Sequence, residues 1–346
     1  MNIALIGLGM VARTHVRAII AMQDQAKLVG VFARDRTSAA EFVTDACADV
    51  TVTPHIYNDI SEIASDANVD VVVICTPPNA RVEIVEELAK AGKHIIMEKP
   101  LERTMEAAQE IVETCEKYNV ELGVFFQHRM RQSSIKMQQL MAEHAFGEIA
   151  LVEIAVPWWR EQAYYDEPGR GTYARDGGGV LISQAIHTLD LALSILGPVE
   201  KVQAMARSTS LHKMESEDYV SAGLDFASGA VGSLVASTAS FPGGVESITV
   251  HGSKASAVLK AGVIDVSYQD GTKDSHGEEA SSGGGADPMA FTHAWHQSII
   301  EDFLTSVKAG KKPAVTGREA LNVQALIEAL IQSSNQGRAV SVQPVK

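Results

Sequence analysis

The sequence predicts an α/β protein with two domains: residues 1–122 built on a doubly wound parallel sheet, and residues 123–346 forming a second, strand-rich α/β domain. Two observations carry this prediction. Apolar, strand-like runs alternate with helix-like stretches as far as residue 122, and short strand-like runs separated by turns follow from Glu148 onwards. With 346 residues, of which 46% are hydrophobic, the chain is long enough to bury two cores.

The first element is a buried strand over residues 2–6, an apolar run too short for a helix. It ends at a tight turn, where a residue without a side chain is needed, and a second glycine two positions later lets the backbone approach a phosphate. The helix over residues 10–22 then presents its free amides to the anion. The turn predicts a dinucleotide-binding site with these cofactor contacts: Gly7, Gly9, Met10 and Val11.

The second strand, residues 27–32, should end beside the adenosine ribose of such a dinucleotide. An acidic residue at this place would accept hydrogen bonds from the ribose, but the chain has Ala33 followed by Arg34. A small residue and a guanidinium group leave room and charge for a 2′-phosphate, which favours NADP over NAD. In the alternative interpretation, Arg34 is a solvated cation and Asp35 is the ribose ligand.

The third apolar run, residues 69–75, leads into the loop Thr76-Pro77-Pro78-Asn79. Ligands bind at the carboxyl ends of the strands in doubly wound sheets. We therefore expect Thr76, Pro77 and Asn79 to border the nicotinamide half of the cofactor.

After a helix over residues 80–91, the strand at 94–97 ends at Glu98, Lys99 and Pro100. A lysine in a loop is usually a solvated charge. At the carboxyl end of a parallel strand, two strands from the phosphate turn, Lys99 is instead a candidate for the active site, and Glu98 is placed with it at the cofactor.

Four motifs occur in the order GLGMVA, TPPN, AGKHIIMEKPL and GGGVLISQAIHTLD, the last at Gly177–Asp190. In this combination, and over nearly its whole length, the chain resembles the Gfo/Idh/MocA family of NAD(P)-dependent oxidoreductases. The resemblance implies an N-terminal Rossmann domain. It also implies a C-terminal α/β domain whose open, mainly antiparallel sheet carries the substrate and often the oligomer contact.

The resemblance also implies roles for single residues. Lys99 corresponds to the lysine of the family's EKP motif, which contacts the substrate hydroxyl and the nicotinamide ribose, and His187 corresponds to the histidine usually credited as acid/base. The family often has an aspartate four residues before that histidine, where this chain has Ser183, which takes up no proton at neutral pH. The histidine often found after the T-P motif is Arg81 here.

Hydride transfer from a secondary alcohol leaves a proton to be removed from oxygen, which a histidine or a lysine of lowered pKa can do near neutrality. His187 lies in an apolar helical stretch, residues 180–196, with Gln184 on the neighbouring turn. A hydrogen-bonded core histidine is the alternative interpretation. The cofactor motif and Lys99 favour a catalytic role for His187.

An aromatic and basic segment precedes that helix, with Trp158 and Trp159 followed by Arg160, Tyr164 and Arg170. Aromatic faces stack on sugar rings, and guanidinium groups bind carboxylates or phosphates. Aromatic clusters also pack at subunit contacts, and both interpretations stay open for the tryptophans. The predicted substrate contacts are Arg160, Tyr164, Arg170, Ser183, Gln184 and His187.

Composition excludes several classes of function. The net charge of −14 disfavours a nucleic-acid partner, and no apolar run is long enough for a membrane span. The first residues begin a strand and not a charged leader, and the three cysteines are scattered, which together predict a cytoplasmic protein. His293 and His296 lie three apart without an evident partner cluster, so we expect no metal site.

In the second domain, residues 271–290 are rich in Gly, Ser, Asp and Glu and predict a surface loop, and a last helix is expected over 318–334. The expected strands are 149–156, 199–206, 219–226, 230–237, 246–251 and 257–261.

The sequence thus predicts an NAD(P)-dependent dehydrogenase or reductase that acts on a sugar, a cyclitol or a related polyhydroxylated molecule, with acidic and nucleotide-linked sugars among the candidates. The alternative is a regulator of the same fold that senses NAD(P) or a metabolite without turnover. We expect a homodimer or homotetramer, because an exposed sheet face would be a large apolar surface for a monomer.

Overall fold

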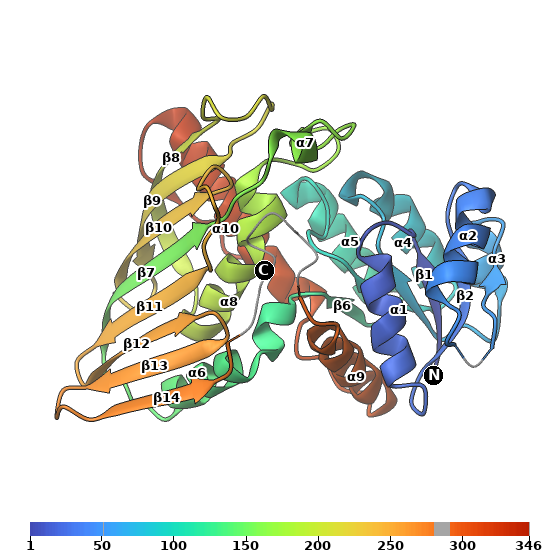
Figure 1. The fold of residues 1–346 in the computed structure, drawn as a ribbon, viewed down its shortest axis with the longest axis horizontal. Helices are drawn as coiled ribbons and strands as arrows, with labels where there is room; N and C mark the ends of the chain where they lie inside the picture. The colour runs from blue at the N-terminus through green and yellow to red at the C-terminus, as the bar shows by residue number, and fades with distance from the viewer. Residues whose placement is uncertain (51, 280–290, 346) are drawn as a thin grey trace. The chain divides into compact units, whose positions relative to one another are not determined.

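The structure is a computed structural model that describes residues 1–50, 52–279 and 291–345 (Figure 1). The chain divides into two compact units, Met1–Gln127 with Thr292–Leu321, and His128–Phe291 with Asn322–Lys346. The segment Thr292–Leu321 thus groups with the N-terminal unit, whereas the sequence analysis gave all of residues 123–346 to the second domain. None of the helices in the described ranges is both long and apolar enough to cross a membrane.

The first unit contains a six-stranded parallel sheet in the order β3-β2-β1-β4-β5-β6. This is the strand order of a Rossmann fold, in which the strand order across the sheet reverses between β1 and β4. The strands β1, β4, β5 and β6 are buried along most of their length, because helices cover both faces of the sheet. The strands are β1 (Asn2–Ile6), β2 (Lys27–Phe32), β3 (His55–Ile56), β4 (Val71–Ile74), β5 (His94–Met97) and β6 (Leu122–Val124).

Helices α1 and α9 pack together on the sheet of this unit, as do α4 and α5 (Figure 1). The helix predicted at residues 10–22 begins two residues later, because the glycine turn runs as far as Val11. The helices are α1 (Ala12–Ala21), α2 (Arg36–Ala46), α3 (Ile60–Ser65), η1 (Pro78–Ala80), α4 (Arg81–Lys90), α5 (Met105–Lys117) and α9 (Ala294–Lys308).

The second unit is built on a nine-stranded sheet in the order β14-β13-β12-β11-β7-β10-β9-β8-β15. Its pairs are antiparallel except for β7 with β10, so the sheet is mainly antiparallel, as the resemblance implied. The strands are β7 (Ile149–Pro157), β8 (Val199–Arg207), β9 (Tyr219–Phe226), β10 (Val231–Ser237), β11 (Ser247–Gly252), β12 (Ala255–Lys260), β13 (Val263–Tyr268), β14 (Lys273–Gly277) and β15 (Val340–Ser341).

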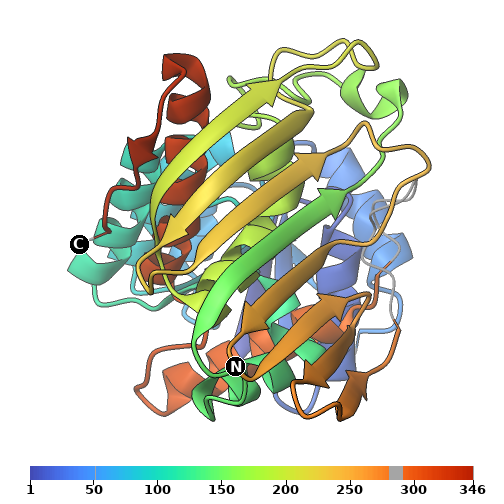
Figure 2. The same cartoon turned by 90° about the vertical axis from the view of Figure 1, so that its left-hand side faces the viewer.

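Figure 2 shows this sheet with its strands in front of helices, and α6 and α8 contact it from behind. Apolar side chains also point away from the helices: Leu151 on β7, Val231 and Val235 on β10, Met205 on β8 and Val258 on β12 are all more than a third exposed. The remaining helices are η2 (Gln127–Met130), α6 (Gln132–Ala142), α7 (Gln162–Tyr165), η3 (Leu181–Ala185), α8 (Ile186–Leu196) and α10 (Gly317–Gln336).

One prediction in this unit was wrong. The surface loop expected over residues 271–290 begins instead with β14, which pairs with β13, and the sequence analysis named neither strand. Residues 280–290 of that expected loop lie outside the described residues. The helical stretch expected over residues 180–196 is confirmed: it begins as the π-helical turn η3, which holds one more residue per turn than an α-helix, and continues as α8.

Candidate active site

The glycine turn joins the carboxyl ends of three strands in the first unit. Gly7 has a φ of +87°, its N–H donates to the carbonyl of Phe32 at the end of β2, and a Cβ at this position would lie 2.7 Å from the amide nitrogen of Thr76 beyond β4. A larger residue would therefore collide with the neighbouring loop. Gly7 is needed to bring the ends of β1, β2 and β4 together.

The backbone beside Gly9 is open. No other atom lies within 4 Å of a Cβ built on Gly9 in the structure, and Met10 next to it is 46% exposed. The helix α1 starts directly afterwards, with Val11 as an N-cap that offers no hydrogen-bonding side chain. No side chain thus caps this end of α1, and the positive end of a helix favours an anion such as a dinucleotide pyrophosphate.

The loop after β2 carries the predicted ribose contacts. Ala33 is half-buried and Arg34 is exposed, whereas Asp35 is the N-cap of α2. The Asp35 carboxylate accepts hydrogen bonds from the Ser38 hydroxyl and from the amides of Thr37 and Ser38, which hold its pKa below the ordinary value. Both carboxylate oxygens are thus engaged in capping the helix.

The loop after β4 is held by Arg81, whose guanidinium is buried. It donates to the carbonyl oxygens of Thr76, Glu98 and Pro100, and burial lowers its pKa to about 10. Arg81 therefore ties the Thr76–Asn79 loop to the loop that carries Lys99. The sequence analysis noted Arg81 only as a replacement for a histidine, because a charged residue at a helix start gives no sign that it is buried.

The same loop offers a polar atom toward the cofactor side. Within the described part of the chain, the hydroxyl of Thr76 is buried and makes no hydrogen bond. A buried hydroxyl without a partner is costly, and a bound ligand would supply one. This atom and the open backbone at Gly9 fit a nicotinamide dinucleotide along the carboxyl edge of the sheet.

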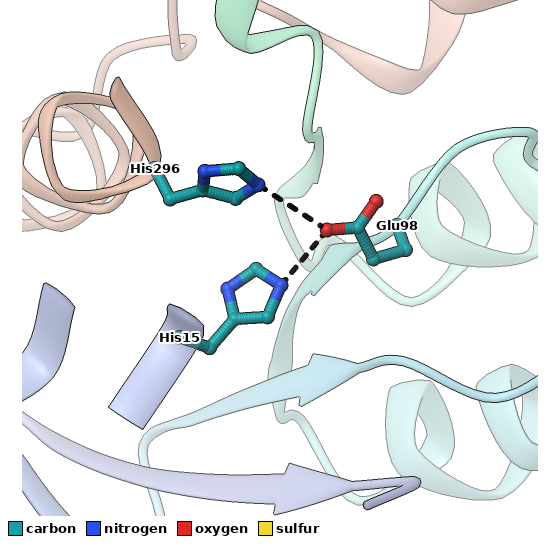
Figure 3. A group of neighbouring side chains, drawn as sticks. All are labelled: His15, Glu98 and His296. Carbon is teal, nitrogen blue, oxygen red and sulfur yellow. Dashed lines mark hydrogen bonds and ion pairs between the residues drawn. The ribbon is translucent and has the colours of Figure 1, made fainter. Parts of the chain in front are cut away.

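Lys99 is half-buried at the end of β5 and precedes a cis peptide bond to Pro100. Glu98, in contrast, turns its carboxylate into the interior, where it accepts a hydrogen bond from His15 and faces His296 (Figure 3). Two neighbouring residues that the sequence analysis assigned to the cofactor thus have different surroundings. His296 lies beside His15 and Glu98, whereas the sequence showed no partner cluster for it. The sequence could not show that α1 and α9 pack together.

His187 lies in the first turn of α8 in the second unit and is 6% exposed. Its ring stacks on that of His128, with 4.9 Å between the ring centroids and 29° between the planes. His128 in turn lies 4.0 Å from the carboxylate of Glu246, which also accepts a hydrogen bond from Arg131. The sequence analysis missed His128, because nothing in its local sequence connects it to His187.

The glycine motif before His187 permits a close approach of two backbone segments. A Cβ at Gly179 would lie 1.8 Å from the carbonyl oxygen of Glu217. The carboxylate of Glu217 accepts hydrogen bonds from the amides of Gly179 and Leu181, and burial raises its pKa. Glu217 thereby fixes the start of η3, the turn that carries Ser183 and Gln184.

Three of the predicted substrate residues lie around a fourth, Tyr164. The guanidinium carbon of Arg160 lies 5.8 Å from the centre of the Tyr164 ring, and that of Arg170 lies 5.0 Å from it. Gln184 donates a long hydrogen bond of 3.4 Å to the Tyr164 hydroxyl. We call Arg160, Tyr164, Arg170 and Gln184 the arginine–tyrosine cluster.

The two tryptophans lie on different sides of this segment. Trp158 is buried, and its indole N–H donates to Glu246. Trp159 packs against the rings of His212 and Phe241. Trp158 therefore serves packing, one of the two interpretations that the sequence left open.

Family models match both parts of the chain. A model described as an oxidoreductase family with an NAD-binding Rossmann fold matches residues 1–126, and one for the GFO/IDH/MocA C-terminal domain matches residues 134–258. The inositol 2-dehydrogenase of Rhizobium meliloti is 27% identical over 98% of this chain and 98% of its own length. The myo-inositol 2-dehydrogenase of Thermotoga maritima is 27% identical over 100% of this chain and 99% of its own length.

Among solved structures, the WlbA dehydrogenase of Chromobacterium violaceum, crystallised with NADH and UDP-GlcNAcA, has a TM-score of 0.84 and 27% identity, covering 100% of this chain and 96% of that one. The strand order of the first sheet and the glycine turn agree with these matches. On the sequence models, the fold and the motifs together, the chain belongs to the Gfo/Idh/MocA family of NAD(P)-dependent oxidoreductases.

Proposed function

We propose that this dehydrogenase transfers a hydride between a nicotinamide cofactor and a secondary alcohol of a sugar, cyclitol or sugar derivative, with Lys99 and His187 handling the proton. The observation that carries the proposal is the meeting of the Gly7 turn, the Thr76 loop and the Lys99 loop at one edge of the parallel sheet. This is where a doubly wound sheet binds its ligand.

A bound nicotinamide ring supplies the hydride acceptor. The chain's own groups then have to hold the substrate oxygen and take its proton. In our proposal, the Lys99 ammonium binds and polarises the reacting oxygen, and the His187 imidazole takes the proton, which a histidine can do near neutral pH. The hydroxyl of Ser183 takes up no proton at this pH, so in our proposal it orients the imidazole at most.

His128 supports this assignment of His187. A stacked neighbour restricts the rotation of the imidazole, and the Arg131–Glu246 ion pair, with 2.7 Å between nitrogen and oxygen, anchors the far side of His128. In relatives with an aspartate at the position of Ser183, the carboxylate can orient the histidine. We propose that the stack with His128 does so here.

The cofactor in our proposal is NADP. Arg34 is exposed and available to a 2′-phosphate, whereas the Asp35 carboxylate already caps α2. A ribose hydroxyl needs a free acidic acceptor at this place, and an arginine serves a phosphate better.

The arginine–tyrosine cluster supports a substrate with an acidic group. Two guanidinium groups beside one tyrosine ring provide planar donors for a carboxylate or phosphate and an aromatic face for a sugar ring. The similarity to inositol dehydrogenases and to a dehydrogenase crystallised with UDP-GlcNAcA supports cyclitols and sugar acids as the first compounds to test.

The second unit supports self-association. Leu151 on β7, Val231 and Val235 on the neighbouring β10, and Val258 on β12 are exposed on one sheet, on the side away from α6 and α8. Several exposed apolar side chains on one sheet are typical of an interface. We propose that two copies of the chain meet through this face.

A substrate panel tests the proposed activity. The purified protein is mixed with NAD or NADP and with myo-inositol, scyllo-inositol, glucose, glucuronic acid or UDP-GlcNAcA, and the nicotinamide absorbance is followed. We expect turnover with at least one compound and a lower KM for NADP. Tight cofactor binding without turnover on an extended panel would instead favour the sensor that the sequence left as the alternative.

A further inference from the structure

Three side chains meet in the interior of the first unit, next to the Lys99 loop. Glu98 ends β5, His15 lies on α1 and His296 lies on α9, and Figure 3 shows both imidazole rings directed at one carboxylate oxygen. The distance from Nε2 of His15 to Oε1 of Glu98 is 2.8 Å, and that from Nε2 of His296 is 3.6 Å. We call these residues the His–Glu–His cluster.

The cluster is almost completely enclosed. His15 is 0% exposed, His296 is 1% exposed, and the Phe125 ring lies 4.3 Å from the His15 ring, measured between centroids. A carboxylate in such a place is costly unless donors compensate it. The hydrogen bond from His15 is a direct one, whereas 3.6 Å is too long for a hydrogen bond, so His15 contributes more than His296.

The surroundings of the cluster shift the pKa values of Glu98 and His296. Although burial raises it, the hydrogen bond from His15 and the contact with His296 hold the pKa of Glu98 well below its ordinary value. Burial lowers the pKa of His296, and Nδ1 of His15 has no hydrogen-bond partner among the described residues. The buried guanidinium of Arg81 is the positive group that interacts with Glu98 from outside the cluster.

Two histidines and a carboxylate are also a familiar set of zinc ligands, but the geometry favours a hydrogen-bonded cluster. Ligands about 2.05 Å from a tetrahedral metal are roughly 3.3 Å apart, more than the 2.8 Å between His15 and Glu98. Metal-bound histidines also donate their second ring nitrogen to a partner, which His15 lacks in the described part of the chain.

The cluster connects the elements that must be in register for catalysis. α1 begins at the glycine turn, β5 leads into Lys99, and α9 packs on α1. We infer that His15 and His296 are positioning residues which, through Glu98, hold the Lys99 ammonium in place relative to the bound cofactor. This inference rests on the proposed function, because it concerns the geometry of hydride transfer.

The test compares apolar and hydrogen-bonding replacements of both histidines. His15→Leu removes the donor to Glu98, and His296→Leu removes the second polar neighbour. His15→Gln and His296→Gln keep an N–H at a similar reach, and His94→Leu is the control. His94 is the first residue of β5, at the opposite end of the strand from Glu98, and its Nδ1 accepts a hydrogen bond from the amide of Glu121. His94→Leu therefore also removes one histidine hydrogen bond from β5, but away from the cluster. Circular dichroism first checks that each variant is folded.

Two readouts follow. The first is the NMR signal of ¹³C-dimethylated Lys99, which reports the surroundings of the ammonium group without substrate. The signal is assigned by its absence in Lys99→Arg. The second is single-turnover hydride transfer at saturating cofactor, with the compound that the substrate panel identifies. A misplacement of about 1 Å can cost roughly a hundredfold in rate. We expect a roughly tenfold to hundredfold loss and a shifted Lys99 signal in His15→Leu, and a smaller loss in His296→Leu.

His15→Gln and His94→Leu should keep the wild-type signal and a rate within about threefold of wild type, since each leaves the N–H contact to Glu98 in place. An unchanged Lys99 signal and rate in His15→Leu would overturn the inference, as would equal losses in the Leu and Gln variants. One equivalent of zinc in the purified protein, lost in His15→Leu, would overturn it in favour of a metal site. If His15→Leu does not fold, His296→Leu and the Gln variants decide.

Failure of the proposed function is distinguishable from failure of the inference. A wild-type protein without turnover, whose Lys99 signal still shifts in His15→Leu alone, would contradict the proposed activity and support the cluster. A wild-type protein with turnover, whose Lys99 signal and rate stay unchanged in His15→Leu, would support the proposed activity and contradict the inference on the cluster.

Discussion

Arg34 is the residue that decides the proposed cofactor preference, because the neighbouring Asp35 is engaged with the amides of α2. A charge-assisted contact contributes about 1.5 to 3 kcal/mol, or roughly tenfold to a hundredfold in affinity. Arg34→Ala should therefore raise the Kd for NADP by that factor and leave the Kd for NAD nearly unchanged, as measured by titration of the intrinsic fluorescence.

Arg36→Ala is the matched control for this prediction. It removes the arginine two residues further along, at the start of α2, whose guanidinium is bonded to Asn58 and plays no part at the ribose in our proposal. Its effect on the two cofactors should be small and equal. Equal losses of NAD and NADP in Arg34→Ala, or binding of NAD alone by the wild type, would contradict the NADP assignment.

Lys99 and Glu98 differ in how much of their role could be predicted from the sequence. Lys99 could be predicted as a site residue because it follows an apolar strand, and strand ends in such sheets carry ligands. The direction of the Glu98 side chain could not, because it depends on His15, which is 83 positions away, and on His296 from the far end of the chain. Only the packing of α1, β5 and α9 brings the three together.

Two buried carboxylates, those of Glu98 and Glu217, should make the stability of the fold depend on pH in opposite directions. Glu98 ties β5 to α1 and has a pKa well below 4.5, whereas Glu217 caps η3 and has a pKa raised by burial above 4.5. Glu98 thus stabilises the fold above about pH 4.5, and this contribution is lost as the pH falls towards its folded pKa. The contribution of Glu217 is present below about pH 4.5 and is lost as the pH rises through its folded pKa.

Thermal unfolding of wild type, Glu98→Gln and Glu217→Gln between pH 3.5 and 7 measures both effects. The melting temperature of the wild type relative to Glu98→Gln should fall below about pH 4.5, and that relative to Glu217→Gln should fall as the pH rises above it. Parallel profiles for the two variants would contradict the opposite pKa shifts of Glu98 and Glu217.

Elements differ in how far their sequence reveals them. The strands of the first sheet are continuous apolar runs, and β1, β2 and β5 begin and end where the sequence predicted. β14 has no apolar residue in Lys273–Gly277 and is a strand only because β13 offers it hydrogen bonds. The π-helical turn η3 likewise leaves no periodic signal, since a single extra residue does not change the apolar character of the helix.

For the whole molecule, the exposed face of the nine-stranded sheet predicts a dimer or tetramer. Val235 is 45% exposed near the middle of that face, so Val235→Lys puts a charge into the proposed interface. We expect light scattering to show a multiple of the 37.0 kDa chain for the wild type and a shift toward one chain for the variant. Val52→Lys, which changes an exposed valine of the first unit, should keep the wild-type mass.

A wild type that is monomeric and fully active at micromolar concentration would contradict this prediction. The sequence could indicate the second sheet from its alternating strands, because alternation follows from one buried face. It could not indicate which exposed residues form one surface, since that depends on the order of the strands in the sheet.

The central claim is that Lys99 and His187 share the proton chemistry and that Ser183 does not. Loss of a positioned acid or base typically costs about 10²- to 10⁴-fold in rate, whereas a neutral hydrogen bond contributes about 1 kcal/mol. Single-turnover hydride transfer, measured for Lys99→Met, His187→Ala and Ser183→Ala with cofactor bound, should fall by that factor in the first two variants and by less than about tenfold in the third. Equal damage in Ser183→Ala and His187→Ala, or wild-type rates in Lys99→Met and His187→Ala, would contradict the claim.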